Sequence, residues 1–165
     1  MAPEPIPLTL FTTHPAQLPD PLGTAATDPL AFAELTRLLR QSGLARVEVA
    51  TLQLHRLLAA ILRTQPRPQQ DLSNLAVRLL RAAVPDAPWD NPPAWPAWRQ
   101  LLPHVLVVTD PHRTIDTAEE DVAWLLDRAA QYLHTRGEAG PARPLHERAL
   151  ELRRLRLGDE PPRVR

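Results

Sequence analysis

The side chains that could do chemistry in this chain are histidines, carboxylates and two serines, because the 165 residues include no cysteine. No two histidines have the close spacing with which one helix holds a metal ion. Ser42 and Ser73 both lack the glycine-flanked setting of a nucleophile elbow. The run Glu119-Glu120-Asp121 is typical of the first turn of a helix, where carboxylates complement the dipole. These patterns predict a protein that is not an enzyme and that needs neither cofactor nor metal.

Charge and composition exclude further classes. Nineteen arginines balance nineteen acidic residues, whereas a surface for nucleic acid or an anionic membrane usually needs a basic excess. The start, MAPEPIPLTLF, lacks the basic beginning and long apolar centre of a signal peptide. The longest apolar run, at 57–62, is too short to cross a bilayer. We therefore expect a cytoplasmic protein with no membrane span.

The segment 1–66 predicts two helices around a small hairpin. Asp28 and Pro29 are typical of a helix start, and Gly43 suits the left-handed residue after its end. Apolar and polar residues alternate over 45–49 and 52–54, which predicts a hairpin with its turn at Ala50-Thr51. The next helix carries apolar residues at helical spacing, namely Leu54, Leu57, Leu58, Ile61 and Leu62. This order predicts a winged-helix-like unit.

The segment 67–115 predicts a helical connector. A leucine stripe spans 72–83, a proline-rich loop follows at 85–93, and a further helix carries Trp95 and Trp98. Pro103 removes a backbone donor inside that helix and should kink or break it. Together with Trp124, these tryptophans lie at helical spacing among leucines, so we expect core packing rather than a stacking platform for bases.

The segment 116–158 predicts two further helices, roughly 117–136 and 141–157, before a tail at 159–165. Small and large residues fall at Leu126, Ala130, Leu133, Ala142, His146 and Ala149. This spacing resembles a tetratricopeptide repeat, and the ending Leu157-Gly158-Asp159-Glu160-Pro161 resembles the longer-linker variety. A bulky packing residue usually occupies the place of His146, so we expect a partly buried histidine there rather than a ligand.

A single repeat of this kind cannot bury its apolar face and normally needs about three stacked neighbours. We therefore expect the second helix of the repeat to offer an apolar surface to a protein partner or to a second copy of the chain. The predicted surface residues are Leu145, Leu152, Leu155, Arg153 and Arg156.

Three stretches, in order, resemble the middle of NB-ARC-type STAND ATPases from bacteria. LQLHRLLAAILR closes a segment, 28–63, that is similar to their winged helix. NPPAWPAWRQLLPHVLVVTD, at 91–110, is similar to the connector that follows, and 123–162 is similar to their first tetratricopeptide repeat. The resemblance implies a signalling switch in which the repeats sense a partner and the winged helix contacts a nucleotide-binding domain.

The resemblance also gives one histidine a possible role. In that family the histidine of a Met-His-Asp motif contacts the β-phosphate of ADP, and His55 matches it, with Leu54 and Arg56 in place of the methionine and aspartate. The glycines form no phosphate-binding GxxxxGK[ST] loop. ADP or ATP binding is therefore expected only with an ATPase domain supplied in trans. The alternative is that His55 is a capping or surface histidine.

The sequence as a whole predicts a mostly α fold, in which a winged-helix-like N-terminal unit with one small β-hairpin precedes a helical array ending in a repeat-like helix pair. The predicted function is a non-enzymatic protein–protein interaction and regulatory module. Two alternatives stay open. One is a small DNA-binding regulator using Arg37, Arg40 and Gln41 or Arg56 and Arg63. The other is a fragment of a longer NB-ARC protein.

Overall fold

A computed structural model of the chain describes residues 3–64, 72–112 and 119–157. The N-terminal elements are β1 (Ile6–Pro7), α1 (Thr9–Thr12), the 3-10 helix η1 (Pro15–Gln17), α2 (Leu22–Thr27), α3 (Pro29–Gln41), β2 (Ala45–Val47), β3 (Thr51–Leu54) and α4 (Arg56–Thr64). The C-terminal elements are α5 (Leu72–Ala83), the 3-10 helix η2 (Pro92–Ala94), α6 (Trp95–Val108), α7 (Glu119–Thr135) and α8 (Ala139–Leu157). The predicted mostly α fold with a small hairpin is confirmed.

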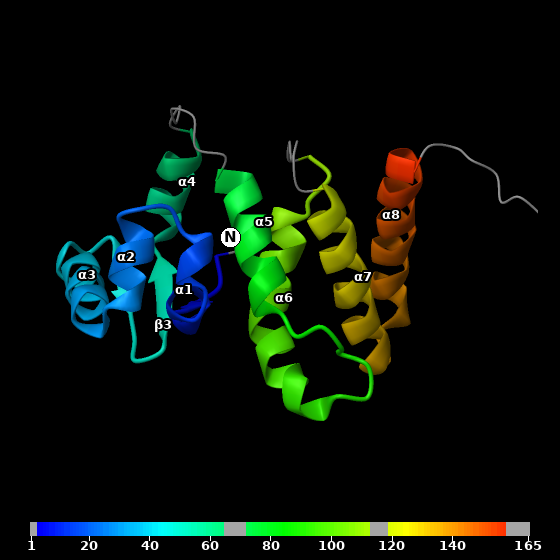
Figure 1. Cartoon of the computed structure of the whole chain (residues 1–165), viewed down its shortest axis with the longest axis horizontal. Coiled ribbons are helices and arrows are strands. Elements are labelled where there is room, and N and C mark those ends of the chain that lie inside the picture. Colours follow the sequence, from blue (N-terminus) through cyan, green and yellow to red (C-terminus); the bar gives the residue numbers. More distant parts are fainter. Residues whose placement is uncertain (1–2, 65–71, 113–118, 158–165) are drawn as a thin grey trace, which may run out of the picture.

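The molecule has two regions, which Figure 1 shows side by side. The N-terminal region holds the small sheet with α1 to α4. The second region, which we call the helical layer, is made of α5 to α8 lying next to one another. β1 contacts α6, and α1 contacts α5, so the start of the chain joins the two regions.

Helix α3 begins and ends at the residues that the sequence predicts. The Asp28 carboxylate accepts a hydrogen bond from the Leu30 backbone N–H at 2.8 Å, and Pro29 stands in the first turn, where its missing donor costs little. Gly43 follows the last turn with φ of +69°, a conformation that strains residues with a Cβ. The chain then enters β2.

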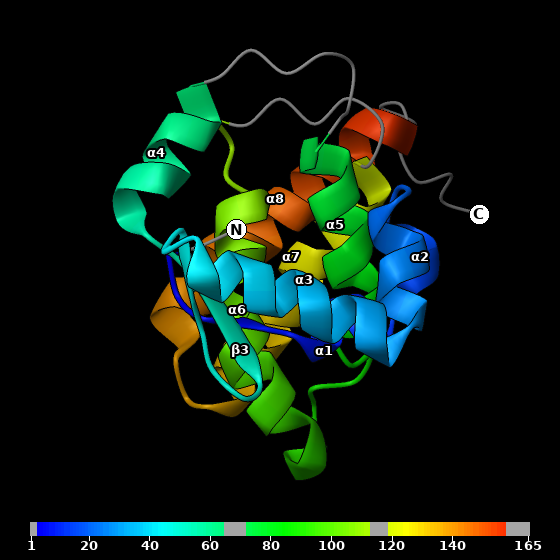
Figure 2. The same cartoon turned by 90° about the vertical axis from the view of Figure 1, so that its left-hand side faces the viewer.

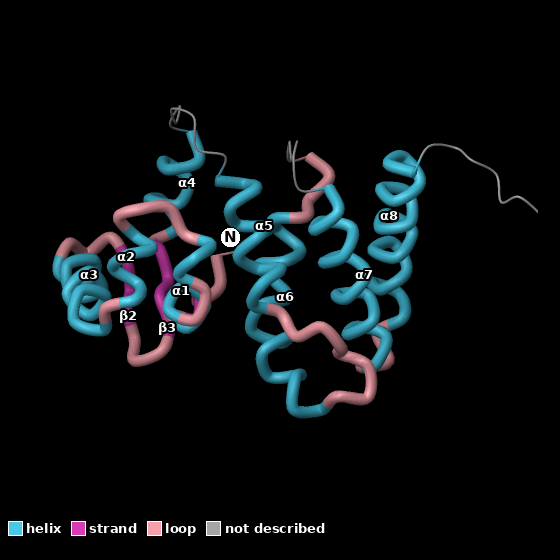
Figure 3. The backbone as a smooth tube through the Cα atoms, in the orientation of Figure 1, coloured by secondary structure: helices cyan, strands magenta, loops and turns pink. Residues whose placement is uncertain are grey.

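The sheet has three strands in the order β1-β3-β2, all antiparallel, and Figure 3 labels β2 and β3 among the surrounding helices. Ala45 pairs with Leu54, and the Glu48 N–H donates to the Thr51 carbonyl at 2.9 Å. The turn therefore lies at 49–50, one residue earlier than the sequence predicts. β-Branched Thr51 belongs to β3, where it pairs with Pro7 of a third strand. The sequence predicts a short extended segment around Ile6 but not its pairing in this sheet.

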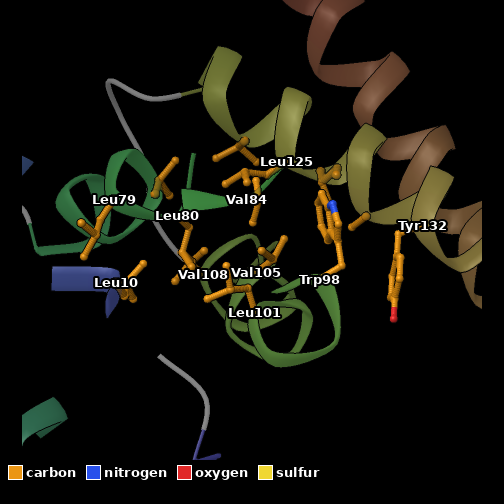
Figure 4. Close-up of a cluster of buried hydrophobic side chains, with 14 of the residues drawn as sticks. Leu10, Leu79, Leu80, Val84, Trp98, Leu101, Val105, Val108, Leu125 and Tyr132 are labelled. Carbon is orange, nitrogen blue, oxygen red and sulfur yellow. The ribbon is translucent and has the colours of Figure 1, made fainter. Parts of the chain in front are cut away.

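One buried cluster continues from Ile6 through the helical layer, and Figure 4 shows part of it, from Leu10 to Leu125. Its completely buried side chains come from neighbouring helices and include Val77, Leu80, Trp98, Val105 and Leu125. The same cluster extends to Ala149 of α8, so it crosses the boundaries of the three sequence segments, 1–66, 67–115 and 116–158. Burial of this apolar surface is the main stabilising contribution that the structure identifies.

Helix α6 continues through Pro103, so of the predicted kink or break the break is wrong, while the kink stays a prediction. A proline inside a helix costs about 3 kcal/mol through its lost hydrogen bond and ring clash. In α6 the residues around the proline are buried, among them Trp98, Leu101 and Val105. Their burial offsets the local cost, which shows tertiary packing overriding a helix-breaking residue.

Helices α7 and α8 form an antiparallel pair within a residue or two of the predicted ranges. The positions of the predicted repeat spacing are buried with one exception, which is His146. Between the helices, Gly137 has φ of +78°, and the Glu138 N–H donates to the Leu133 carbonyl at 2.9 Å. The predicted repeat ending at 158–161 and the tail lie outside the described residues.

Candidate interaction surfaces

The leucines predicted to form a partner surface on α8 divide into two groups. Leu145 and Leu152 are partly buried and pack against the core of the helical layer. Leu155 is 74% exposed, and Leu150, which the sequence analysis did not select, is 47% exposed. The apolar surface that α8 presents to solvent is therefore narrower than the one predicted, because its own partner helix α7 takes up two of the three leucines.

The two predicted arginines of α8 form ion pairs with α7. Arg153 Nη2 lies 3.6 Å from Asp127 Oδ2, and Arg156 Nη1 donates to the Glu120 carboxylate. The hydrogen bond from Arg156 lowers the pKa of the Glu120 carboxyl. Both arginines keep about half of their side-chain surface exposed. These ion pairs lie at the edge of the α7–α8 contact and, being half exposed, contribute little to its stability.

His146 is a second α8 residue, after Arg153, that faces Asp127. Its Nδ1 lies 3.3 Å from Asp127 Oδ1, and 44% of its side chain is exposed. Gln131 Nε2 also donates to Asp127, at 3.1 Å. The histidine is thus a partly covered polar contact between helices, in a position that the resemblance assigns to a bulky packing residue.

His55 lies between β3 and α4, in the N-terminal region and far along the chain from α8. Its Nδ1 accepts from the Leu57 N–H at 3.4 Å, and its carbonyl accepts from the Ala59 N–H at 2.9 Å. The side chain is exposed. This geometry fits the capping interpretation of His55. The nucleotide contact that the resemblance implies stays a prediction.

A buried histidine that the sequence did not single out as structural lies in α6. His104 is completely buried, and its Nε2 donates to the carbonyl oxygen of Pro5 at 3.3 Å. Burial lowers the pKa of this imidazole because the charged form loses its hydration. His104 therefore fastens the start of the chain to the helical layer as a neutral side chain.

The tryptophans pack as predicted. Trp98 is completely buried, stacks on Tyr132 with ring centroids 5.7 Å apart, and donates Nε1–H to the Pro85 carbonyl at 3.2 Å. The Arg81 guanidinium lies 3.4 Å from the ring centroid of Trp124, which joins α5 to α7. Trp98 therefore has no exposed face for a nucleobase, and Arg81 covers one face of Trp124.

A surface that sequence periodicity placed in the core is exposed instead. On α4, Leu57 is 70% and Ile61 is 54% exposed, and the helix makes no extensive contact with another described element. Figure 2 shows α4 standing at the side of the N-terminal region. One sequence feature could have indicated the exposure of these side chains. The segment 45–71 contains no second apolar stripe on which α4 could pack.

Neither a metal site nor a membrane-spanning helix finds support within the described ranges. No three His, Asp or Glu side chains in 3–64, 72–112 and 119–157 gather closely enough to hold a metal ion. Among those same residues, no helix combines the length and apolarity needed to cross a membrane.

Comparison of the chain with protein-family models, with curated proteins and with solved structures finds no match.

Proposed function

We propose that the chain is a non-enzymatic interaction and regulatory module, similar to the sensor side of NB-ARC-type STAND ATPases. The observation that carries this proposal is the order of its parts. A strand, three α-helices and a β-hairpin precede a helical layer that ends in the α7–α8 pair. A cytoplasmic location belongs to the same proposal.

The N-terminal region supports its winged-helix half. Strand β1 comes before the helices, and β3 lies between β1 and β2 in the sheet. This arrangement lets the first strand close a sheet whose other two strands form the wing. The winged-helix interpretation therefore rests on strand order as well as on local sequence patterns.

The α7–α8 pair supports its repeat half. Ala130, Ala142 and Ala149 are buried where the two helices meet, which permits the close approach typical of helical repeats. Leu150 and Leu155 remain exposed on α8, and Arg148 donates to the Thr109 carbonyl, which ties α8 to the end of α6. A firmly held helix with exposed leucines is suited to binding a protein partner or a second copy.

A photo-crosslinking amino acid at Leu155 tests this function in the source cells. We expect it to yield one dominant protein adduct, identified by mass spectrometry, and Leu150→Ser should reduce its yield. The same probe at Leu30, which is 82% exposed on α3, is the matched control. Adducts no stronger at position 155 than at position 30 would contradict an interaction through α8.

Nucleotide binding enters the proposal only through an ATPase domain supplied in trans. With such a domain added, His55→Ala should weaken ADP binding measured by calorimetry. An unchanged ADP affinity would mean that His55 only caps α4 and does not contact the nucleotide. Asp28→Ala, which removes a cap distant in sequence from His55, controls for general loss of stability.

A DNA-binding regulator is the second candidate, and local charge favours it. Residues 29–64 carry five arginines and two acids, and both acids are paired with arginines, Glu34 with Arg37 and Glu48 with Arg46. If DNA is the ligand, binding to duplex DNA should weaken steeply between 50 and 200 mM salt, as counterion release requires. No binding at the lower salt concentration would remove this candidate.

A further inference from the structure

The loop between α5 and η2 presents a tryptophan to solvent. Trp89 is 59% exposed, and one side of its indole stacks on the ring of His134 with the centroids 5.8 Å apart. Figure 3 shows this loop reaching the end of α7, the helix whose last turn carries His134. The other three tryptophans, Trp95, Trp98 and Trp124, are buried or half-buried. Trp89 therefore differs from them in offering an indole face to a ligand.

The packing of the loop holds Trp89 in place. Pro88 is completely buried, and the carbonyls of Pro85 and Pro88 accept hydrogen bonds from the indole N–H groups of two other tryptophans at 3.2 and 3.1 Å. Asp90 has φ of +51°, a conformation that residues with a Cβ rarely adopt and that the surrounding packing must maintain. Because Trp89 is fixed before binding, it loses little conformational entropy when a ligand covers it.

The charge around Trp89 is negative. From 82 to 98 the chain contains two acids, Asp86 and Asp90, both exposed, and no basic residue. Trp89 also lies against the last turn of α7, where the helix dipole is negative. Arg136, just after that turn, is paired with Glu138 at 3.0 Å. The surroundings of Trp89 therefore favour a positively charged ligand.

The molecule already contains one tryptophan that is covered by a cation. The Arg81 guanidinium lies 3.4 Å from the ring centroid of Trp124, and carboxylates of Asp86 and Asp121 lie 3.5 and 3.9 Å from its nitrogens. At Trp89 the same two parts, an indole and a neighbouring carboxylate, are present. Within the described ranges, however, no guanidinium lies over this ring and no ion pair involves the carboxylate that follows it.

We propose that Trp89 and Asp90 bind an arginine side chain of another protein. The guanidinium covers the free face of Trp89, and the Asp90 carboxylate accepts hydrogen bonds from its N–H groups. Arginine suits this site better than lysine, because a planar guanidinium stacks on an indole and still donates within its own plane. We call these two residues the Trp89 site. It is separate from the exposed leucines of α8 and does not depend on the function proposed for them.

Two other occupants use only one of the two residues. A nucleobase could stack on Trp89, but its phosphates would approach Asp86 and Asp90, which repel them. An apolar pocket of a partner would cover Trp89 and bring the Asp90 carboxylate out of water without a donor. An arginine side chain uses both the ring and the carboxylate.

The test measures binding of two synthetic peptides to the full chain by NMR titration. The probe is Gly-Gly-Arg-Gly-Gly with blocked ends, and its control carries citrulline, the neutral isostere of arginine. We expect the indole N–H signal of Trp89 and the backbone N–H signals of its loop to shift with a dissociation constant of about 1 mM, because exposed contacts of this kind stabilise only modestly. The citrulline peptide should bind about fivefold more weakly.

Variants of the protein show whether the arginine occupies the Trp89 site. Trp89→Ala should weaken binding about fivefold, and Trp89→Phe should restore part of the loss. Asp90→Asn keeps a side chain that tolerates positive φ and should weaken binding about threefold. Glu151→Gln, which removes the same charge from an exposed position on α8, is the matched control and should leave the affinity unchanged. Circular dichroism of each variant checks that the fold is kept.

Four results would overturn the proposal. The first is equal binding of the citrulline peptide, and the second is unchanged binding in Trp89→Ala. The third is a loss of affinity in Glu151→Gln as large as that in Asp90→Asn, which would mean that only the overall charge matters. The fourth is a dimer in sedimentation that Trp89→Ala dissociates, which would assign the ring to a second copy. Crosslinking at Leu155 reports on α8 separately.

Discussion

The helical layer and the N-terminal region use similar amphipathic helices with different results. In the layer, α5 and α7 bury leucines almost completely, for example Leu80 and Leu125 at 0% exposure. In the N-terminal region, α3 has no buried residue, and the described side chains of α4 are all partly or fully exposed. Helical spacing thus specifies that a helix has an apolar face, and a neighbouring element decides whether that face is covered.

The largest effect should come from the centre of the helical layer. Trp98→Ala removes a buried ring, its stacking on Tyr132 and its hydrogen bond to the Pro85 carbonyl. We expect the free energy of unfolding to fall by about 3–5 kcal/mol, measured by urea denaturation. A loss below about 1 kcal/mol would mean that the layer is no better packed than the N-terminal region.

The contact between His104 and Pro5, which links the start of the chain to the helical layer, should weaken in acid. Burial lowers the pKa of His104, so below the ordinary histidine pKa of about 6.5 the unfolded chain binds more protons than the folded chain. The free energy of unfolding should be steady above neutral pH and fall as the pH drops through 6.5 and below. His104→Asn should flatten this dependence in urea denaturation at stepped pH, and an unchanged pH profile would assign the effect to other groups.

A smaller effect is expected at the start of α3. Asp28→Ala removes the acceptor of the Leu30 N–H and should lower the free energy of unfolding by about 1 kcal/mol. Asp28→Ser, which keeps an acceptor, is the control and should lose less. Thermal unfolding followed by circular dichroism measures both. Equal losses in the two variants would mean that the cap does not stabilise α3.

The smallest effect should come from α4. Leu57→Ser changes an exposed side chain and should alter the free energy of unfolding by no more than about 0.5 kcal/mol. The loss of unfolding free energy in Leu57→Ser, compared with the loss in Trp98→Ala, measures how differently the two regions are packed. A loss of about 2 kcal/mol or more would show that α4 packs against the rest of the molecule in solution.

Most elements could be predicted from short-range chemistry. Asp28, Pro29 and Gly43 bound α3 through capping and backbone preferences that need no distant partner. The predicted repeat positions of α7, Leu126, Ala130 and Leu133, are all buried. The predicted stripe of α5 is correct only in part, because Leu79 and Leu80 are buried, whereas Val77 and Asn74 are buried outside it.

The turn of the hairpin lies one residue earlier than predicted because Thr51 pairs within β3 instead of standing in the turn. Sequence patterns did not place β1 in the sheet, since it pairs with β3 from some 45 residues away along the chain.

The candidate surfaces were predicted less well for the same reason. Leu145 and Leu152 were expected to be free and instead pack beside α7, while Leu57 and Ile61 were expected in a core and are exposed. All four side chains belong to helices that carry apolar residues at helical spacing. Which of them meets another helix is decided by how the elements are placed in space.

The amino-acid sequence by itself determined the helices, their caps and the balance of charge, because these follow from contacts within a few residues. Only the tertiary structure decided that α6 continues through Pro103, that Ile6–Pro7 completes a sheet, and that Leu57 and Ile61 of α4 are exposed. These outcomes depend on free energies of packing between segments far apart in the chain, which no local pattern contains.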